Sequence, residues 1–336
     1  MKQDRRLRVC VAIEPETRRK LFSDRALRSL QEAGDAVFRE TSDRMTEAAL
    51  AELARGSQAV VTSWRTPLLT AALLDSLPDL GLIAHTGVSV RPYVDASLFR
   101  AGVRVTNAGD AMTVPVAEFT LMQILRALRS GMRENGALKS ADWGICDNPA
   151  GHNLAATTVG VIGAGRIGRR VIRLLRAFDA TVLVHDPLLT EADATAMGAA
   201  RAGFDETLGA ARVVTLHAPA IAATRGMIGA RELALMRDGA WLVNTSRPSL
   251  LDGEALLREL RSGRLSAALD VFDREPLPAD DPLRGLPNVL LSPHAAFMTV
   301  ECLHRLGDAA VDAVLRFARG EPLDNEVTLE MAETMT

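Results

Sequence analysis

The sequence predicts an α/β protein built from two doubly wound parallel sheets. Short apolar runs alternate with amphipathic stretches along the chain, which is the pattern of parallel strands joined by crossover helices. The chain has 336 residues, more than one hydrophobic core usually supports, and 48% of them are apolar, enough for two cores. A long apolar helical stretch at residues 114–128 separates a first group of strands from a second. We therefore expect two domains.

The first group of strands predicts one small open sheet. Helical patterns, such as those at residues 24–33 and 46–55, separate its strands. The predicted strands are residues 9–13, 59–62, 81–85 and 103–107.

The second group has six predicted strands, enough for a complete dinucleotide-binding fold. They are residues 158–162, 181–185, 213–216, 240–244, 266–271 and 289–291. A last helix at residues 300–319 follows all of them and could return to the first domain. The second domain would then be an insertion within the first.

Composition and charge exclude several classes of protein. Charged residues make up 24% of the chain and the net charge is -3, so neither sign is in excess for binding nucleic acid or an anionic membrane. The charged start is followed by only five apolar residues, 9–13, too few for a signal peptide or a membrane span. We therefore expect a cytoplasmic protein. Cys10, Cys146 and Cys302 lack metal-type spacing, so we predict free thiols and no metal site.

A glycine-rich motif marks the expected nucleotide site. Gly163, Gly165 and Gly168 form GxGxxG directly after the strand at 158–162, and a helical pattern at 166–178 begins inside the motif. A lone GxGxxG is often an ordinary turn, but this context suits a turn that holds pyrophosphate at a helix N-terminus. The expected binding residues are Gly163, Gly165, Arg166, Ile167 and Gly168.

Asp186 ends the next strand, where an acidic residue is expected to hold the ribose hydroxyls of the adenosine. Pro187, Leu188 and Leu189 follow it, so no arginine is adjacent to accept a 2′-phosphate, and the carboxylate would repel one. NAD is therefore favoured over NADP.

We expect a Rossmann domain of residues 109–296, inserted into a flavodoxin-like substrate-binding domain of residues 1–108 and 297–336.

Three polar residues follow strands of the second domain, and open parallel sheets bind ligands at the carboxyl ends of their strands. They are Arg247, Glu275 and His294. Reduction of a 2-oxo acid requires a cation for the carboxylate and the polarised carbonyl, a proton donor for the alkoxide, and a group that keeps the donor protonated. Arg247 suits the first role, His294 the second and Glu275 the third. Taken singly, each could be an ordinary surface cation, turn residue or buried histidine.

Several motifs carry a family resemblance. In chain order they are GVIGAGRIG, LHAPAIAATRGMIG, LVNTSR, LDVFDREP and LSPHAA. With them, nearly the whole chain resembles the NAD-dependent D-isomer-specific 2-hydroxyacid dehydrogenases. The resemblance implies interconversion of a D-2-hydroxy acid and a 2-oxo acid by hydride transfer, with His294 and Glu275 as the acid/base pair and Arg247 binding substrate. It also implies a homodimer formed through the nucleotide domain, in which the helix at 114–128 would have a partner.

The resemblance assigns further residues. The backbone of Thr86, Gly87 and Val88 would hold the substrate carboxylate, and His217 and Pro219 would line the adenosine side. Residues along the dinucleotide would be Thr113, Asn244, Thr245, Ser246 and Asp270, with Asp270 near the nicotinamide carboxamide.

The sequence departs from the family pattern around the expected pocket. Pro248 replaces the usual glycine after the arginine, Ala295, Ala296 and Phe297 replace Ile-Gly-Gly, and the turn at Gly87 reads HTGVSV. Thr86 stands where the phosphite-oxidising branch has a lysine, which sets that substrate aside. The particular acid is not fixed by the sequence. Pocket candidates are Trp64, Arg65, His85 and Tyr93, of which Trp64 and Arg65 follow the strand at 59–62 and could equally serve packing.

Two other functions remain open at this point. The first is an NAD(H)-sensing corepressor of the same fold, against which the intact set of Arg247, Glu275 and His294 argues. The second is a plain Rossmann reductase of sugars or alcohols, in which Arg247 would have no carboxylate to bind.

Overall fold

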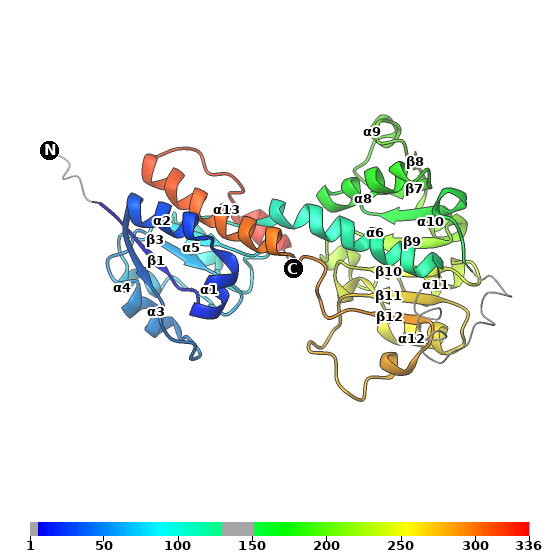
Figure 1. Cartoon of the computed structure of the whole chain (residues 1–336), viewed down its shortest axis with the longest axis horizontal. Coiled ribbons are helices and arrows are strands. Elements are labelled where there is room, and N and C mark those ends of the chain that lie inside the picture. The colour runs from blue at the N-terminus through cyan, green and yellow to red at the C-terminus, as the bar shows by residue number, and fades with distance from the viewer. Residues whose placement is uncertain (1–5, 130–150, 336) are drawn as a thin grey trace. The chain divides into compact units, whose positions relative to one another are not determined.

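The computed structural model describes residues 6–129 and 151–335. The chain divides into two compact units, one of Met1–Met112 and Met298–Thr336 and the other of Thr113–Phe297. The second unit is therefore an insertion within the first, and the two are coloured by residue number in Figure 1.

The first unit is a five-stranded parallel sheet in the order β2-β1-β3-β4-β5. This is the flavodoxin-like order, in which the first strand lies between the second and the third. The strands are β1 Leu7–Val11, β2 Gly34–Phe38, β3 Ala59–Thr62, β4 Leu82–His85 and β5 Arg104–Thr106.

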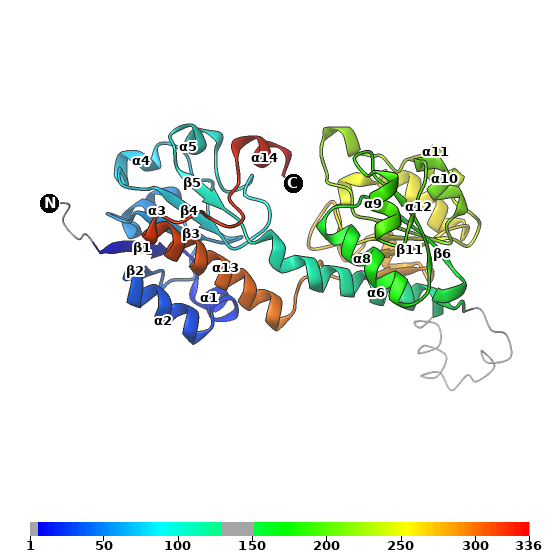
Figure 2. The ribbon, with the colours of Figure 1, turned by 90° about the horizontal axis from the view of Figure 1, so that it is seen from above.

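Helices cover both faces of this sheet (Figure 2). One face carries α1 Pro15–Leu21, α2 Asp24–Ala33 and α13 Val300–Arg319. The other carries α3 Glu47–Leu53, α4 Leu73–Ser76, α5 Ala96–Arg100 and the terminal α14 Leu329–Thr334. The short turn η1 Gly109–Met112 completes the unit. The prediction that the helix at 300–319 returns to the first group of strands is confirmed.

The strand β2 was missed by the sequence prediction, which placed four strands in this sheet. It is an edge strand in which only Gly34 is buried, so it lacks the apolar run of its neighbours. Gly34 pairs with Leu7, and a Cβ there would lie 2.0 Å from the Leu7 carbonyl oxygen. Glycine is thus required by the close approach of the two strands.

The second unit is a parallel sheet in the order β12-β11-β10-β9-β6-β7-β8. The order reverses between β6 and β9, as in a dinucleotide-binding Rossmann fold. The strands are β6 Thr158–Ile162, β7 Thr181–His185, β8 Ala200–Arg201, β9 Val213–Leu216, β10 Trp241–Asn244, β11 Ser266–Leu269 and β12 Val289–Leu291. The two-residue edge strand β8 is exposed at both residues and was missed, so this sheet has seven strands where six were expected.

The helices of the second unit form two layers around its sheet. One layer has α6 Thr113–Arg129, α8 Arg166–Ala177 and α9 Glu191–Ala196. The other has α10 Phe204–Ala210, α11 Ala230–Leu235 and α12 Gly253–Arg261. Short 3₁₀ turns join them at η3 Leu154–Ala156, η4 Ala222–Thr224, η5 Pro248–Leu250 and η6 Pro282–Gly285.

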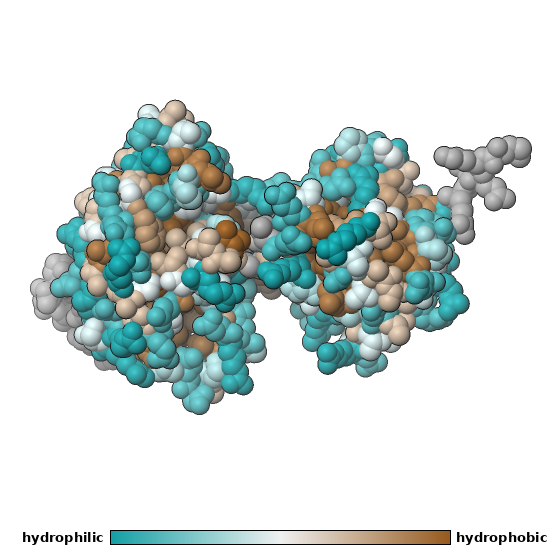
Figure 3. Space-filling view, turned by 180° about the vertical axis from the view of Figure 1, so that it is seen from behind, coloured by the Kyte–Doolittle hydropathy of each residue, from teal (hydrophilic) through white to brown (hydrophobic). Residues whose placement is uncertain are grey.

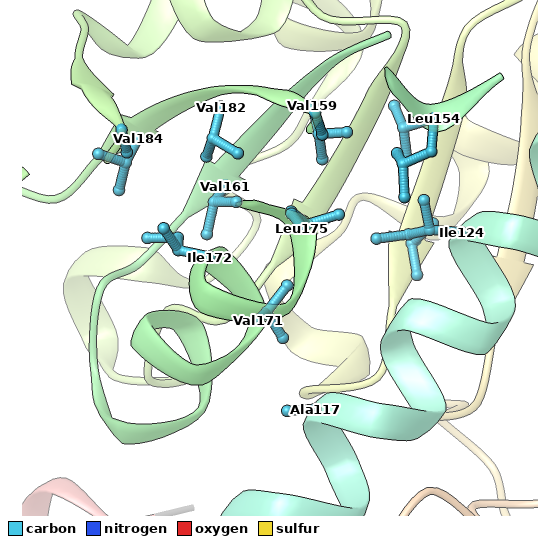
Figure 4. Packing of buried hydrophobic residues seen from close by; sticks show 14 of the residues in the cluster. Ala117, Ile124, Leu154, Val159, Val161, Val171, Ile172, Leu175, Val182 and Val184 are labelled. Atoms are coloured by element: carbon cyan, nitrogen blue, oxygen red, sulfur yellow. The ribbon is translucent and has the colours of Figure 1, made fainter. Parts of the chain in front are cut away.

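The helix α6 belongs to the core of the second unit. Its Ala117 and Ile124 share one buried cluster with Val171 and Leu175 of α8 (Figure 4). Within the described residues, Gly109–Arg129 is long and apolar enough to cross a membrane by length and composition alone, but half of that stretch is buried in the structure. A core helix meets the same criteria.

On the face seen in Figure 3, hydrophilic and hydrophobic side chains are interspersed over both units.

The cysteines that the structure describes, Cys10 and Cys302, are free and buried, as predicted, while Cys146 lies outside the described residues. Burial raises the pKa of Cys10 to about 12 and that of Cys302 to about 11, so both thiols are unreactive at neutral pH. In the described part of the chain, no group of three or more His, Cys, Asp or Glu residues could hold a metal ion.

His85 ends β4 inside the first unit and is 1% exposed. Its Nδ1 lies 3.0 Å from the hydroxyl of Thr62, and its ring stacks on Tyr93 with centroids 4.6 Å apart. Burial lowers the pKa of His85 to about 3, so the imidazole is neutral in the folded protein near pH 7.

The burial of His85 predicts a loss of stability in acid. Unfolding returns its pKa to about 6.5, so the unfolded chain binds one more proton than the folded chain between that pH and about pH 3. The free energy of unfolding is therefore not reduced by His85 above about pH 6.5. As pH falls below that value, it decreases by up to roughly 1.4 kcal/mol per pH unit, because the unfolded chain takes up the extra proton. Urea unfolding between pH 7 and pH 5 should show a smaller pH dependence in His85→Gln. The exposed control His152→Gln should keep the wild-type dependence, and equal slopes in all three proteins would contradict the prediction.

Candidate active site

The glycine turn follows β6 and leads into α8, as the sequence predicts. Gly163 has φ +98°, and a Cβ there would lie 2.6 Å from the Ala218 amide nitrogen. A Cβ at Gly168 would lie 2.1 Å from the Gly163 carbonyl oxygen, so this glycine lets the helix pack against the turn. At Gly165, the residue before α8, a Cβ would meet nothing within 4 Å. Its missing side chain thus leaves open space at the helix N-terminus, which fits an approaching pyrophosphate.

Asp186 lies beside this turn, at the end of β7. Its Oδ2 accepts a hydrogen bond of 2.7 Å from the Ala164 amide, and its Oδ1 accepts one of 2.9 Å from the Leu188 amide. The backbone thus fixes the carboxylate next to the glycine turn. Each oxygen keeps a further lone pair that can accept from a ribose hydroxyl. The sequence pointed to Asp186 but gave no sign of its contact with Ala164.

A set of hydrogen bonds that begins at the end of β10 fixes the backbone of Arg247. The buried Asn244 accepts from the Ser246 amide at 3.0 Å and donates to the Arg247 carbonyl oxygen at 2.9 Å. Arg247 donates from Nη1 to the Ser246 carbonyl oxygen at 2.9 Å. Burial lowers the pKa of the Arg247 guanidinium, and the Glu275 carboxylate opposes that shift. The structure therefore brings the charges of Arg247 and Glu275 within electrostatic range of each other.

His294 and Glu275 form a direct pair. The Nδ1 atom of His294 lies 2.8 Å from Oε2 of Glu275, and Oε1 of Glu275 accepts from the Phe272 amide at 3.0 Å. The pair occupies Nδ1, so Nε2 is the ring nitrogen that can exchange a proton with a ligand. The side chains are 42% and 36% exposed, which leaves them accessible.

Asp270 holds the loop that carries His294. It is fully buried just after β11, and its two carboxylate oxygens each accept a 3.0 Å hydrogen bond, one from the Ala295 amide and one from the Ala296 amide. His294 itself has φ +52°, a left-handed conformation that a non-glycine residue adopts only when its surroundings hold it. Asp270 is therefore a positioning residue for His294. Its contact with the nicotinamide carboxamide stays a prediction.

A cavity of about 590 Å³ lies beside the His294–Glu275 pair, within the second unit. Apolar side chains form much of its wall, and both members of the pair line it. The other lining residues include Phe272, Leu277, Arg284, Leu291 and Ser292.

The predicted substrate turn, Thr86 to Val88, lies in the first unit at the end of β4. The Gly87 carbonyl oxygen accepts from the Ala108 amide at 2.9 Å, and Asn107 donates to the Val88 carbonyl oxygen at 2.7 Å. A Cβ on Gly87 would lie 2.6 Å from Nε2 of His85 and 3.2 Å from Nε1 of Trp64. The structure thus brings Trp64, His85 and Gly87 together. The side chain of Arg65 instead donates hydrogen bonds to the Glu14 carboxylate.

The remaining predicted cofactor residues lie in the second unit. The Nε2 of His217 lies 3.0 Å from the Thr215 hydroxyl, and burial lowers the pKa of His217 to about 4. The Thr245 hydroxyl lies 2.7 Å from that of Thr120, and Ser246 donates to the Ala218 carbonyl oxygen at 3.2 Å. Thr113 begins α6, and Pro219 is exposed after β9. The cofactor contacts of these residues stay predictions.

Comparison with known proteins identifies the family. Residues 121–296 match the NAD-binding domain of the D-isomer specific 2-hydroxyacid dehydrogenases. A D-3-phosphoglycerate dehydrogenase of Methanocaldococcus jannaschii is 32% identical over 306 residues, which cover 90% of this chain and 57% of that protein. A glyoxylate reductase of Korarchaeum cryptofilum is 31% identical over 277 residues, 81% of this chain and 83% of the relative. A solved structure from Thermus thermophilus superposes with a TM-score of 0.82 at 28% identity, covering 96% of this chain and all of the other.

The fold and the glycine turn define a dinucleotide-binding α/β protein. The chain belongs to the D-isomer-specific 2-hydroxyacid dehydrogenase family, as its motifs predicted, and its cofactor is NAD. It spans 57% of the length of the phosphoglycerate dehydrogenase and most of the length of the glyoxylate reductase.

The fixed carboxylate of Asp186 predicts selection against NADPH. A 2′-phosphate would meet its negative charge, so NADH should bind at least roughly tenfold more tightly, a gap of about 1.4 kcal/mol. Asp186→Ala should narrow this gap because it removes both the repulsion and the ribose contact. Calorimetric titration of the two cofactors measures the affinities, and equal binding by the wild type would contradict the assignment.

The buried carboxylate of Asp270 predicts a stability cost for a nearly isosteric change. In Asp270→Asn an amide NH₂ would face a backbone N–H, so the free energy of unfolding should fall by about 1–3 kcal/mol. Urea denaturation measures this change. Asp273→Asn makes the same chemical change at an exposed position and should leave stability nearly unaltered. An Asp270→Asn protein as stable as the wild type would contradict the proposed role of Asp270 in fixing the loop of His294.

Proposed function

We propose that this protein is an NAD-dependent D-2-hydroxyacid dehydrogenase that interconverts a D-2-hydroxy acid and a 2-oxo acid. The observation that carries the proposal is the 2.8 Å pair of His294 and Glu275, with the Arg247 charge in range, in the NAD-binding unit of this family. These residues supply one acid/base group, one orienting carboxylate and one cation, which is the set that the reaction requires.

The cofactor side follows from the glycine turn. Gly163, Gly165 and Gly168 would hold the pyrophosphate at the N-terminus of α8, with Asp186 on the ribose hydroxyls. When bound, NAD accepts or supplies the hydride.

The chain's own residues carry the rest of the reaction. Arg247 binds the substrate carboxylate and polarises the 2-oxo group through its planar guanidinium. His294 donates a proton from Nε2 to the oxygen as the alcohol forms, and in the reverse direction its neutral form takes the hydroxyl proton. Glu275 accepts from Nδ1, which orients the ring and stabilises the imidazolium.

The substrate is a small 2-hydroxy or 2-oxo acid, and the binding of a carboxylate by the backbone of Thr86, Gly87 and Val88 stays a prediction. The related proteins are named for phosphoglycerate and for glyoxylate, so these acids head the panel to be tested. We further propose a cytoplasmic homodimer that uses the face of α6 on which Met122 is 39% exposed. The corepressor alternative has less support, because the acid/base pair is intact in geometry.

Arg247→Ala should separate substrate binding from cofactor binding. The variant should lose at least roughly a hundredfold in kcat/KM with a 2-oxo acid, because a charge-assisted bidentate contact worth about 3 kcal/mol disappears. Its affinity for NADH should stay near the wild-type value. Loss of nicotinamide absorbance measures turnover, and calorimetry measures binding. Arg237→Ala removes an exposed arginine of the same unit and should behave as wild type.

One outcome would favour the corepressor. A wild-type protein that binds NADH but reduces none of a broad panel of 2-oxo acids would replace the dehydrogenase proposal.

Glu275→Gln tests the acid/base pair through its kinetics. The variant removes the carboxylate that accepts from Nδ1 of His294 and nearly keeps its shape, so the ring loses its orienting partner. The value of kcat/KM should fall at least roughly tenfold in both directions, because a hydrogen bond to a charged group worth about 1.5–3 kcal/mol is lost. The affinity for NADH should stay near the wild-type value. Wild-type kcat/KM in both directions would exclude Glu275 from the mechanism.

A further inference from the structure

An exposed arginine of α8, Arg169, reaches back to the glycine turn of the second unit. Its Nε donates to the Ala164 carbonyl oxygen at 2.8 Å. The amide of the same residue, Ala164, donates to Oδ2 of Asp186 at 2.7 Å. Ala164 thus binds Arg169 through its carbonyl group and Asp186 through its amide, which brings both charged side chains to the same part of the cofactor site.

The Arg169 guanidinium keeps donors that a ligand can use. Its Nη1 contacts Sδ of Met197 at 3.8 Å, and a thioether sulfur is a weak acceptor. Among residues 6–129 and 151–335, Nη2 has no acceptor and the guanidinium forms no ion pair. Both N–H groups of Nη2 are therefore available to an acceptor that arrives with the cofactor.

The helix α9 shows on which side of the cofactor site this cation lies. Met197 directly follows α9, and Asp193 lies within it. Hydrogen bonds from Thr190 hold the pKa of Asp193 below its ordinary value, and the positive charge of Arg169 adds to that shift. The guanidinium therefore lies toward α9, the helix that follows β7, and away from the N-terminus of α8 where the pyrophosphate is expected.

Asp186 identifies the part of the dinucleotide that comes nearest to this cation. The carboxylate is expected to accept from the ribose hydroxyls of the adenosine, so the 2′ position of that ribose lies beside it. A 2′-phosphate, the group that distinguishes NADP from NAD, would meet Asp186 and Arg169 together. The sequence gave no sign of this pairing, because no arginine follows Asp186 and the cation comes from the helix before β7.

We propose that Arg169 is a second determinant of the choice between NAD and NADP, a cation that binds the 2′-phosphate when Asp186 does not repel it. Arginine suits this role because its planar guanidinium can donate two hydrogen bonds to one phosphate. In the wild type the Asp186 carboxylate lies at the ribose hydroxyls themselves, so its repulsion keeps NADH preferred. Arg169 makes that preference smaller than Asp186 alone would make it, whatever acid the protein reduces.

Calorimetric titration with NADPH and with NADH, in the absence of any 2-oxo acid, tests the role of Arg169. The starting protein is Asp186→Ala, in which the repulsion is removed. Adding Arg169→Gln to it should weaken NADPH binding at least roughly tenfold, because a charge-assisted contact with the phosphate is lost. NADH has no 2′-phosphate, so its affinity for the two proteins should agree within about twofold.

The matched control is Arg173→Gln, which removes an exposed arginine one turn further along α8. In the Asp186→Ala background it should leave both affinities unchanged. Circular dichroism checks folding. If Asp186→Ala does not fold, the same comparison in the wild-type background decides, where Arg169→Gln should increase the preference for NADH.

Three results would overturn the proposal. The first is an Asp186→Ala protein that binds no NADPH, and the second is an NADPH affinity that Arg169→Gln leaves unchanged. The third is an equal loss of NADPH and NADH affinity in Arg169→Gln, because Arg169 would then contact a group that both cofactors share, such as the pyrophosphate.

Discussion

Asp270 ties together the carboxyl ends of three neighbouring parallel strands. It directly follows β11, its amide donates to the Asn244 carbonyl oxygen at the end of β10, and its carboxylate accepts from two amides in the loop after β12. Hydrogen bonds to a charged acceptor are the stronger kind, and this acceptor is fully buried. The loop of His294 is thus fixed to the strand that leads to Arg247. The carboxylate fixes the loop of the proposed acid/base group, and the Asp270 amide joins that arrangement to the strand that leads to the proposed substrate cation.

The supporting groups are buried, while the groups that would react are open to solvent. Asn244 and Asp270 are fully buried, whereas His294 and Glu275 have side chains that are 42% and 36% exposed. Around the exposed pair water screens the charges, so their interaction is weak until a ligand displaces that water. Because the supporting residues are buried and fixed, His294 and Glu275 already have their geometry before a ligand binds. The interaction between their charges becomes stronger when the ligand displaces water.

The sequence predicted the elements whose signals are local. β3, β6 and β7 have the predicted bounds, and the glycine turn lies between β6 and α8 as expected, because each is a short apolar run or a motif readable on its own. The strands β2 and β8 could not be read, since an edge strand needs no apolar run. The hydrogen bonds from the Ala295 and Ala296 amides to Asp270 join positions far apart in the sequence through the backbone, so no local pattern predicts them. The roles of Arg247, Glu275 and His294 remain predictions with a supporting geometry.

The contact between Asp270 and the loop after His294 uses backbone amides alone. The side chains at positions 295 and 296 are therefore not needed for it, which explains how alanines can stand there in place of the family's larger and smaller residues. Ala296 is 4% exposed and has little room for a larger side chain, whereas Ala295 is partly exposed. A substitution at position 295 can therefore change the surface of the loop while the anchor of His294 stays in place.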